Sequence, residues 1–117
     1  MTEAAKKPWP VELRLNPAQT MLTVEFDSGE RFVLPAEYLR VESPSAEVQG
    51  HGPGQKQIVT GKEQVTIAAL EPVGNYAVRI RFDDGHDTGL FTWDYLHELG
   101  RERAVKWAAY LKAAGKT

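Results

Sequence analysis

One short pattern occurs twice in the chain, and this internal repeat limits the possible folds more than any other feature. The first copy reads FDSG at residues 26–29 and is followed by Tyr38, whereas the second reads FDDG at residues 82–85 and is followed by Tyr95. In both copies an apolar-alternating strand leads into an Asp/Gly turn, a short return strand and the start of a helix. Two copies are too few for a solenoid, which needs about three repeats. The repeat therefore predicts one compact domain built from two related β-β-α units.

The turn in each copy has a specific backbone requirement. Asp and Gly are residues that tolerate the positive φ found in tight hairpin turns. We therefore expect Gly29 and Gly85 to occupy equivalent turn positions, both with positive φ.

Alternation of apolar and polar residues predicts the strands. It occurs at residues 11–15, 22–26, 31–34, 65–69 and 76–82. The first three of these strands form a meander, and a chain with its strands early and its helices late is typical of the α+β class. The predicted fold is a single α+β domain with an antiparallel-rich sheet and a C-terminal helix packed on it.

Capping residues and helical periodicity predict three helices. Pro35 suits the first turn of a short helix. Thr92 is a suitable N-cap for a second helix, which Gly100 would end. The last helix covers residues 104–111, where apolar side chains recur at i, i+3, i+4 and i+7, so that Trp107 can pack on the sheet.

The remaining segments are assigned by what they lack. Residues 1–8 are predicted to be a disordered tail, and residues 9–114 to be the single domain. The segment from 43 to 62 is rich in Gly and Pro and almost free of apolar residues, which predicts a long loop with at most a short strand at 58–59. Such long loops are usually functional or disordered. Residues 72–75 are predicted to form a turn.

Composition excludes several classes of function. The chain has 117 residues and no cysteine, so disulfides, thiolate metal ligands and thiol chemistry are excluded. Its net charge of −2 argues against a nucleic-acid-binding protein, since such proteins are usually basic. No apolar run approaches the ~20 residues of a membrane span, and the first residues lack the apolar stretch of a signal peptide. We therefore expect a cytoplasmic protein that binds neither nucleic acid nor membrane.

Two histidine-containing segments could carry chemistry. Residues 83–87 combine three aspartates with His86, and carboxylates with an imidazole can bind a divalent cation. Adjacent side chains in a turn diverge, however, so a hairpin turn with solvated acids is the favoured interpretation. The second segment runs from His51 to Gln55 and contains two glycines that could let backbone amides approach an anion. It lacks the flanking pattern of a known phosphate loop.

A hydrolase triad could be drawn from Ser43 or Ser45 with His51 or His86 and an aspartate. No Gly-x-Ser-x-Gly motif supports it. Several aromatic residues could line a pocket, but their strand and helix spacing favours a place in the core; they are Tyr76, Phe82, Phe91, Trp93, Tyr95 and Trp107. The residues by themselves therefore indicate no reaction type.

Three stretches resemble a known family. They read LRVESPSAEVQGHGPGQ at 39–55, EPVGNYAV at 71–78 and FDDGHDTGLFTWDYL at 82–96. Over about residues 10–100 the chain resembles the DUF971 family, also called the γ-butyrobetaine-hydroxylase-like N-terminal domain. The most specific part is a D-G-H-x-x-G-x-x-x-W segment, matched by Asp84, Gly85, His86, Gly89 and Trp93.

The resemblance implies particular neighbours for such a domain. In eukaryotic carnitine-synthesis hydroxylases it precedes a 2-oxoglutarate, iron(II) oxygenase domain, and in some plastid iron–sulfur carrier proteins a similar domain follows an ATPase. This chain resembles the stand-alone bacterial members of the family, and the resemblance assigns no activity to them. A chain of 117 residues has no room for the iron site of the oxygenase domain.

The resemblance also implies a metal position that has changed. In the hydroxylases three cysteines and one histidine bind a structural zinc, and the corresponding residues here are Ser43, Ser45, Val48 and His86. One imidazole cannot replace the four protein ligands that such a site normally uses. We therefore expect no metal site and no cofactor. We also expect residues 43–48 to contact His86 directly, with hydrogen bonds in place of the metal.

These observations favour a non-enzymatic accessory or protein-interaction domain, whose partner by analogy would be an oxygenase or an iron–sulfur assembly protein. The alternative is a weak metal- or small-ligand-binding protein that uses His86 and the carboxylates beside it. In either case we expect the binding surface to include six residues, namely His51, Gln55, Asp84, His86, Asp87 and Trp93.

Overall fold

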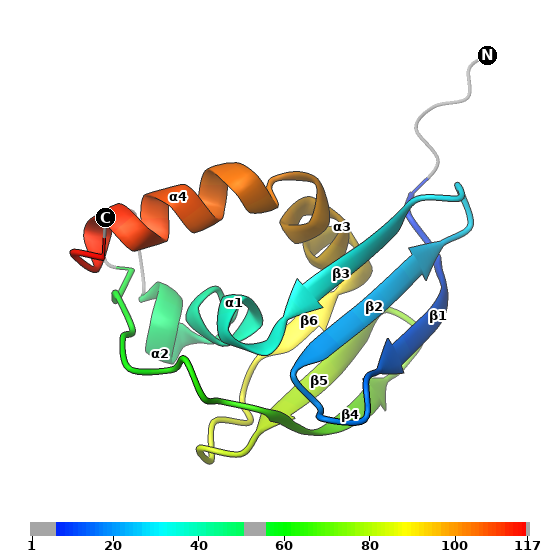
Figure 1. The fold of residues 1–117 in the computed structure, drawn as a ribbon. Coiled ribbons are helices and arrows are strands. Elements are labelled where there is room, and N and C mark those ends of the chain that lie inside the picture. Colours follow the sequence, from blue (N-terminus) through cyan, green and yellow to red (C-terminus); the bar gives the residue numbers. More distant parts are fainter. Residues whose placement is uncertain (1–6, 51–55, 117) are drawn as a thin grey trace.

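The computed structural model describes residues 7–50 and 56–116, which form six strands and four helices (Figure 1). In chain order these are β1 (Pro10–Leu15), β2 (Met21–Phe26), β3 (Arg31–Pro35), α1 (Ala36–Val41), α2 (Ala46–Gln49), β4 (Ile67–Val73), β5 (Ala77–Phe82), β6 (Leu90–Thr92), α3 (Trp93–Arg101) and α4 (Arg103–Ala113). Residues 1–6 of the predicted tail lie outside the described residues. Among the described residues, no helix has the length and apolar character needed to cross a bilayer.

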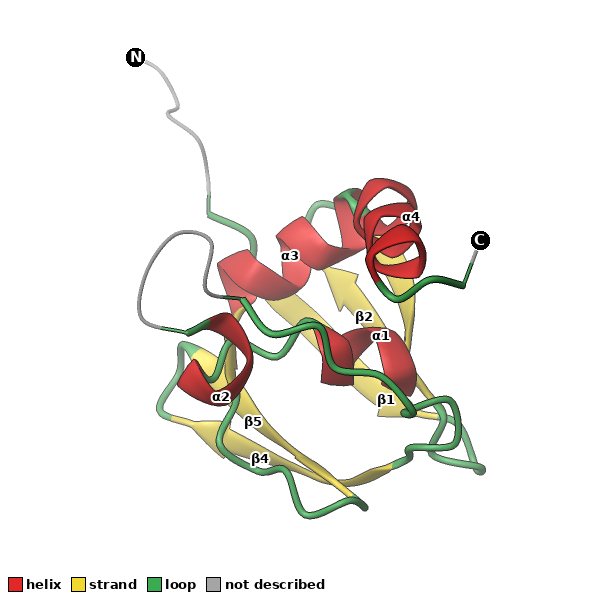
Figure 2. Cartoon of the chain, turned by 90° about the vertical axis from the view of Figure 1, so that its left-hand side faces the viewer, coloured by secondary structure: helices red, strands yellow, loops and turns green. Residues whose placement is uncertain are grey.

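The α+β class is confirmed, and the strands form two three-stranded antiparallel sheets. Their orders are β1-β2-β3 and β4-β5-β6, so each meander has one strand more than the predicted β-β-α unit, whose two strands are β2-β3 and β5-β6. The helices gather on one side of the sheets, where Figure 2 shows them in front of the strands. Each meander ends in a helix, α1 after β3 and α3 after β6.

The two repeated turns have the same hydrogen bonds. The backbone N–H of Phe26 donates to the carbonyl of Glu30, and that of Phe82 donates to the carbonyl of His86, at 2.8 and 2.9 Å. The glycine N–H in turn donates back to the phenylalanine carbonyl, at 2.9 Å for Gly29 and 3.1 Å for Gly85. The φ values of these glycines are 95° and 91°, which confirms the expectation of positive φ.

Replacing Gly29 or Gly85 by alanine should therefore destabilise the protein equally at the two positions. An L-residue in the left-handed region costs about 1–2 kcal/mol, and a Cβ at either position would contact no other group within 4 Å, so strain alone sets the cost. Denaturant unfolding of the two variants measures the loss. A difference of more than about 1 kcal/mol between them would show that the turns are not equivalent.

The two repeated tyrosines bond reciprocally across the molecule. The Tyr38 hydroxyl donates to the carbonyl of Leu99 at 2.7 Å, and the Tyr95 hydroxyl donates to the carbonyl of Glu42 at 2.6 Å. Leu99 is four residues beyond Tyr95, and Glu42 is four residues beyond Tyr38. Equivalent side chains therefore donate to equivalent carbonyls of the opposite unit. Burial raises the pKa of both phenols, so both hydroxyls remain protonated donors.

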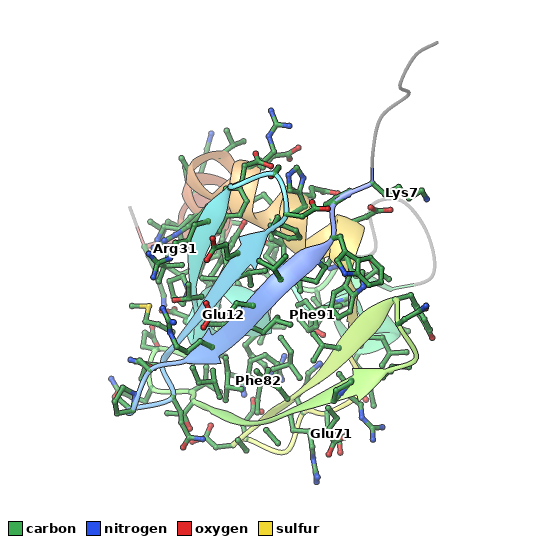
Figure 3. All side chains as sticks on the ribbon, turned by 90° about the vertical axis from the view of Figure 1, so that its right-hand side faces the viewer. Lys7, Glu12, Arg31, Glu71, Phe82 and Phe91 are labelled. Carbon is green, nitrogen blue, oxygen red and sulfur yellow. The ribbon has the colours of Figure 1, made fainter. Side chains whose placement is uncertain are left out.

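The core lies between the two sheets and the helices. Figure 3 shows Phe82 and Phe91 in the space between β1 and the strands β4 and β5, whereas Glu71 is on the outward side. The largest fully buried side chains come from both units; they include Leu22, Phe26, Leu34, Tyr38, Ile67, Ile80, Phe91, Leu96 and Leu99. Trp107 connects α4 to this core, with its ring edge-on to Tyr38 at 6.1 Å between centroids.

The predicted end of α3 at Gly100 is wrong, because the helix continues to Arg101. Gly100 instead allows close packing between α3 and β3. A Cβ at this position would lie 2.4 Å from Cγ of Phe32, so the absent side chain lets the ring of Phe32 in β3 pack directly on the helix backbone. The N-cap prediction is confirmed, since Thr92 Oγ1 accepts a hydrogen bond from the N–H of Tyr95 at 3.2 Å.

Two predictions of local structure between the two units are also wrong. The predicted loop contains helix α2, and the short strand allowed at residues 58–59 does not form. Strand β4 continues through Pro72 to Val73, so the turn lies at residues 74–76. Pro72 is tolerated because β4 is an edge strand, where a missing N–H breaks no ladder bond.

Candidate functional site

The imidazole of His86 is buried beneath the β5–β6 turn. Its side chain is only 3% exposed, and the ring of Phe82 lies 6.1 Å away. The turn fixes the backbone here, since the N–H of His86 donates to Oδ1 of Asp84 at 3.1 Å. The histidine therefore points into the protein rather than into solvent.

Both ring nitrogens of His86 have partners on the segment after α1. Nε2 lies 2.9 Å from Oγ of Ser43 and 3.3 Å from Oγ of Ser45, and Nδ1 lies 3.0 Å from Oε1 of Glu47. Because a carboxylate only accepts, Nδ1 carries the proton and donates to Glu47, and Nε2 accepts the hydroxyl proton of Ser43. We call these four residues the Ser–His cluster. The expected contact of residues 43–48 with His86 is confirmed.

The cluster leaves no space around Ser43. The serine is fully buried, and a Cβ at Gly89 would lie 2.4 Å from its Oγ. Gly89 therefore allows the β6 end of the turn to approach the serine closely. Further bonds connect the two segments, since the Gln49 side chain donates to the Ser43 carbonyl at 2.9 Å and Thr88 donates to Glu47 at 3.3 Å.

Two cations hold Asp84 beside the cluster. Arg40 Nε and Lys62 Nζ lie 2.8 and 2.6 Å from Oδ2 of Asp84. Burial opposes ionisation of this carboxyl, but the hydrogen bonds from Lys62, the His86 backbone and Arg40 outweigh it and hold its pKa well below the usual range. Asp84 is therefore a charged anchor for the turn.

Burial lowers the pKa of His86, and the positive charge of Arg40 lowers it further, while Glu47 and Asp84 partly oppose the change. Because the pKa of the unfolded state is about 6.5 and that of the folded state is lower, the unfolded chain binds more protons between the two values. The contribution of neutral His86 to the free energy of unfolding is therefore complete above about pH 6.5, and it is lost as pH falls toward the folded pKa.

We expect the free energy of unfolding to fall between pH 7 and pH 5 more steeply in the natural protein than in His86→Gln. Glutamine keeps a hydrogen-bonding side chain but does not titrate. Urea unfolding across this range measures both slopes. Equal slopes would mean that His86 does not titrate in this window.

The bonds from Glu47 through His86 to Ser43 follow the order of a hydrolase triad. A nucleophile must reach a substrate carbonyl beside donors that stabilise the oxyanion. Ser43 is fully buried, so its hydroxyl is not open to a substrate from solvent. The arrangement therefore supports a structural hydrogen-bond chain rather than a hydrolase.

The residues at the family's zinc position do not fit a zinc ion. Ser43 and Ser45 present neutral hydroxyls, Val48 is a buried apolar side chain, and His86 Nε2 is already bonded to Ser43. Among residues 7–50 and 56–116, no group of three or more His, Asp or Glu side chains could hold a metal ion.

The structure describes four of the six residues of the predicted binding surface. His51 and Gln55 lie outside the described residues. Asp84 and His86 are adjacent but are occupied by internal bonds, and Asp87 lies half-buried beside them. Sequence reasoning missed Glu47, Arg40 and Lys62, because no pattern showed that these residues would contact the turn. The remaining predicted residue, Trp93, is not part of the Ser–His cluster and lines a hollow elsewhere in the structure.

That hollow, which we call the aromatic hollow, has a volume of about 370 Å³. Its rings are Trp9 before β1, Tyr76 in the β4–β5 turn and Trp93 at the start of α3. Trp9 and Tyr76 are 48% and 52% exposed, and Trp9 lies edge-on to Trp93 with centroids 6.5 Å apart. The Trp93 indole N–H donates to the carbonyl of Asn75 at 2.9 Å.

A second hollow, which we call the α4 groove, lies between α4 and residues 56–59 and also has a volume of about 370 Å³. Its walls expose large apolar side chains, with Val105 72% and Ile58 46% exposed. Val41 and Ala109 contribute further apolar surface, and Lys56 pairs with the buried Glu42 at its edge at 2.6 Å.

Comparison with known proteins gives one family and several structures. The family described as γ-butyrobetaine hydroxylase-like, N-terminal, matches residues 13–97. The crystal structure of a protein of unknown function of the DUF971 family from Acidithiobacillus ferrooxidans is 43% identical, with a TM-score of 0.65 over 78% of this chain and 91% of that one. Two NMR solution structures have TM-scores of 0.79 at 46% and 45% identity; they cover 96% and 100% of this chain and 90% and 89% of those chains. No curated protein matches.

Proposed function

Because the chain belongs to the γ-butyrobetaine hydroxylase-like N-terminal domain family, also called DUF971, we propose that it is a non-enzymatic module that binds another protein. The observation that carries this proposal is the α4 groove. Its exposed Val105 and Ile58 are large apolar side chains on opposite walls of one hollow, and exposed apolar patches of this kind are typical of interaction sites.

The polar residues support the same proposal. The side chains best suited to take part in a reaction are Ser43, His86 and Asp84. All three are occupied by bonds within the protein. A protein that used them in a reaction would need them accessible to a substrate. The α4 groove instead offers apolar walls with charged residues at its edge, including Lys106 and Glu102, which is the usual anatomy of an interface.

We further propose that the partner is an oxygenase or an iron–sulfur assembly protein in the cytoplasm. This step rests on analogy with the fused relatives, so it is independent of the groove. The alternative of metal or small-ligand binding through His86 has less support, since both ring nitrogens and Asp84 are already occupied.

A photo-crosslinking residue placed at position 105 in the full chain tests the proposal in the native host. The matched control places the same residue at position 33, because Val33 is also exposed, at 44%, but lies on the β1–β3 sheet. We expect position 105 to crosslink to one predominant protein and position 33 not to. Val105→Glu should abolish co-purification of that protein, whereas Val33→Glu should not.

Equal crosslinking at both positions, or a partner that both glutamate variants retain, would contradict the groove as the binding surface. If the proteins that crosslink specifically at position 105 include no oxygenase and no iron–sulfur assembly protein, the proposed identity of the partner is wrong. The groove as a binding surface would not be affected by that result.

A further inference from the structure

One wall of the α4 groove is a segment whose backbone has almost no partners. Residues 56–60 form neither a helix nor a strand and contain neither a turn nor a bend; in Figure 1 they begin the green trace beside the end of α4. Within the described part of the chain, the only backbone–backbone hydrogen bond of this segment runs from the N–H of Gln57 to the carbonyl of Val48, at 2.6 Å. Residues 58–60 therefore have backbone N–H and C=O groups without a backbone partner there.

This segment has the composition of a strand but lacks a second strand to pair with. Ile58 and Val59 are β-branched residues, which are enriched in strands. We propose that the partner supplies the missing strand: an extended segment of the partner pairs with residues 58–60 and directs alternate apolar side chains into the α4 groove. Addition of an extended segment to an exposed strand edge is a recurrent mode of recognition. This inference rests on the proposed function, because it specifies how the partner binds in that groove.

The hydrogen bond to α2 determines which backbone groups are available to the partner. Along an extended chain, the N–H groups of successive residues point to opposite sides. The N–H of Gln57 is directed at Val48 in α2, so an extended segment directs the N–H of Val59 to the same side. The N–H groups of Ile58 and Thr60 then point away from α2. These two residues therefore provide the donors for the partner's strand.

The opposite wall leaves room for the side chains of a strand. Val105, Ala109 and Ala113 line the groove from α4 at intervals of four residues, so they lie on one face of this helix. The two alanines are small and leave the groove open beside them, while Val105 and Ile58 border it with exposed apolar surface. Because every second side chain of a strand lies on the same face, a bound strand directs its residues i, i+2 and i+4 toward these apolar walls.

The charge beside the groove favours an acidic partner segment. Helix α4 carries three cations and no carboxylate. Of these, Lys106 is paired with Glu98 at 3.2 Å, whereas Lys112 is exposed and forms no ion pair with another described residue. Lys112 is seven residues after Val105, so it lies on the same face of α4, beside the residues that line the groove. A carboxylate between the apolar residues of the partner's strand is the group that pairs with Lys112.

Peptides of random sequence, displayed on phage and selected on the full chain, test the inference. Groove ligands are the peptides whose binding is abolished by Val105→Glu and retained by Val33→Glu, the matched control on the β1–β3 sheet. We expect their apolar residues at i, i+2 and i+4, with acidic residues among them. Apolar residues at i, i+3, i+4 and i+7 would indicate a helical ligand, which overturns strand addition but not the proposed function. A selection without groove ligands would also overturn strand addition, whereas the crosslinks at position 105 test the proposed function separately.

The affinity of one selected peptide for variants of the full chain tests the backbone pairing. Thr60→Pro removes the N–H and should bind the peptide about fivefold more weakly than Thr60→Ala, the effect of losing one hydrogen bond. Lys112→Gln should weaken binding, whereas Lys7→Gln, which removes the same charge away from the groove, should not. In the natural protein the bound peptide should slow amide exchange at residues 58 and 60 but not at residue 59. Equal affinities of Thr60→Pro and Thr60→Ala, or equal slowing at all three residues, would contradict strand addition.

Discussion

Replacing His86 by alanine is expected to lower the free energy of unfolding by about 3–4 kcal/mol. The change removes a ring that is 97% buried and leaves the hydroxyl of Ser43 without its acceptor. A cavity and unsatisfied buried polar groups each cost about 1–3 kcal/mol. Denaturant unfolding at pH 7.5, where the imidazole is neutral in both states, measures the loss without a contribution from titration.

In His86→Ala, the structure around the cluster should also open more readily than the rest of the protein. Residues 43–50 should exchange their amide protons faster in His86→Ala, while strands β2 and β5 remain protected. Thr88→Ala is the matched control, because Thr88 lies in the same turn and contacts Glu47 but is exposed. We expect it to change stability by less than about 0.5 kcal/mol. A uniform increase in exchange across the whole chain would show that the cluster does not specifically hold this segment.

Gly100→Ala is expected to destabilise the protein by about 2–3 kcal/mol, although alanine is the better helix former. In an exposed helix interior this exchange would stabilise by about 1 kcal/mol. Here the new Cβ would lie 2.4–2.8 Å from three ring atoms of Phe32, which is closer than packing allows. Forcing an extra methyl group into a packed site costs about 1–3 kcal/mol or more, so overpacking outweighs propensity.

A double mutant separates the two effects of Gly100→Ala. In a Phe32→Leu background the clash is reduced, and the same glycine substitution should cost much less or become stabilising. The coupling between the two positions should therefore exceed about 1 kcal/mol in a thermodynamic cycle. Additive effects would show that Phe32 does not press on the helix backbone.

Turn chemistry made the largest part of the fold predictable. The Asp/Gly turns at 26–29 and 82–85 fix the positive φ of Gly29 and Gly85 through local sterics, and strand alternation needs only neighbouring residues. Gly100 was misjudged for the opposite reason. A glycine near a helix end usually terminates it, and the sequence does not show that the ring of Phe32, 68 residues earlier, would occupy the missing side chain's place.

The Ser–His cluster was predictable only in part. The resemblance to the family indicated that Ser43 and Ser45 would meet His86, because the positions correspond to residues around one site. The bond of Glu47 to His86 was not predictable, since α2 has four residues and lies among prolines and glycines that give no helical periodicity. The aromatic hollow was missed because strand and helix spacing favoured a core position for Tyr76 and Trp93, and Trp9 lies before the first predicted strand; the core assignment of Tyr76 is wrong, since this residue is 52% exposed.

The reciprocal tyrosine hydrogen bonds have a consequence for how the amino-acid sequence can evolve. Within a single chain they reproduce an isologous interface, in which the same residue on each side bonds to the same position on the other. Neither half therefore completes its own hydrogen bonding, because the buried Glu42 and Leu99 carbonyls depend on a hydroxyl from across the interface. A substitution that shifts one helix displaces both bonds together. Substitutions in the two halves must consequently be compatible with each other during evolution. The pairs Tyr38–Leu99 and Tyr95–Glu42 mark the positions where a substitution in one half restricts those tolerated in the other.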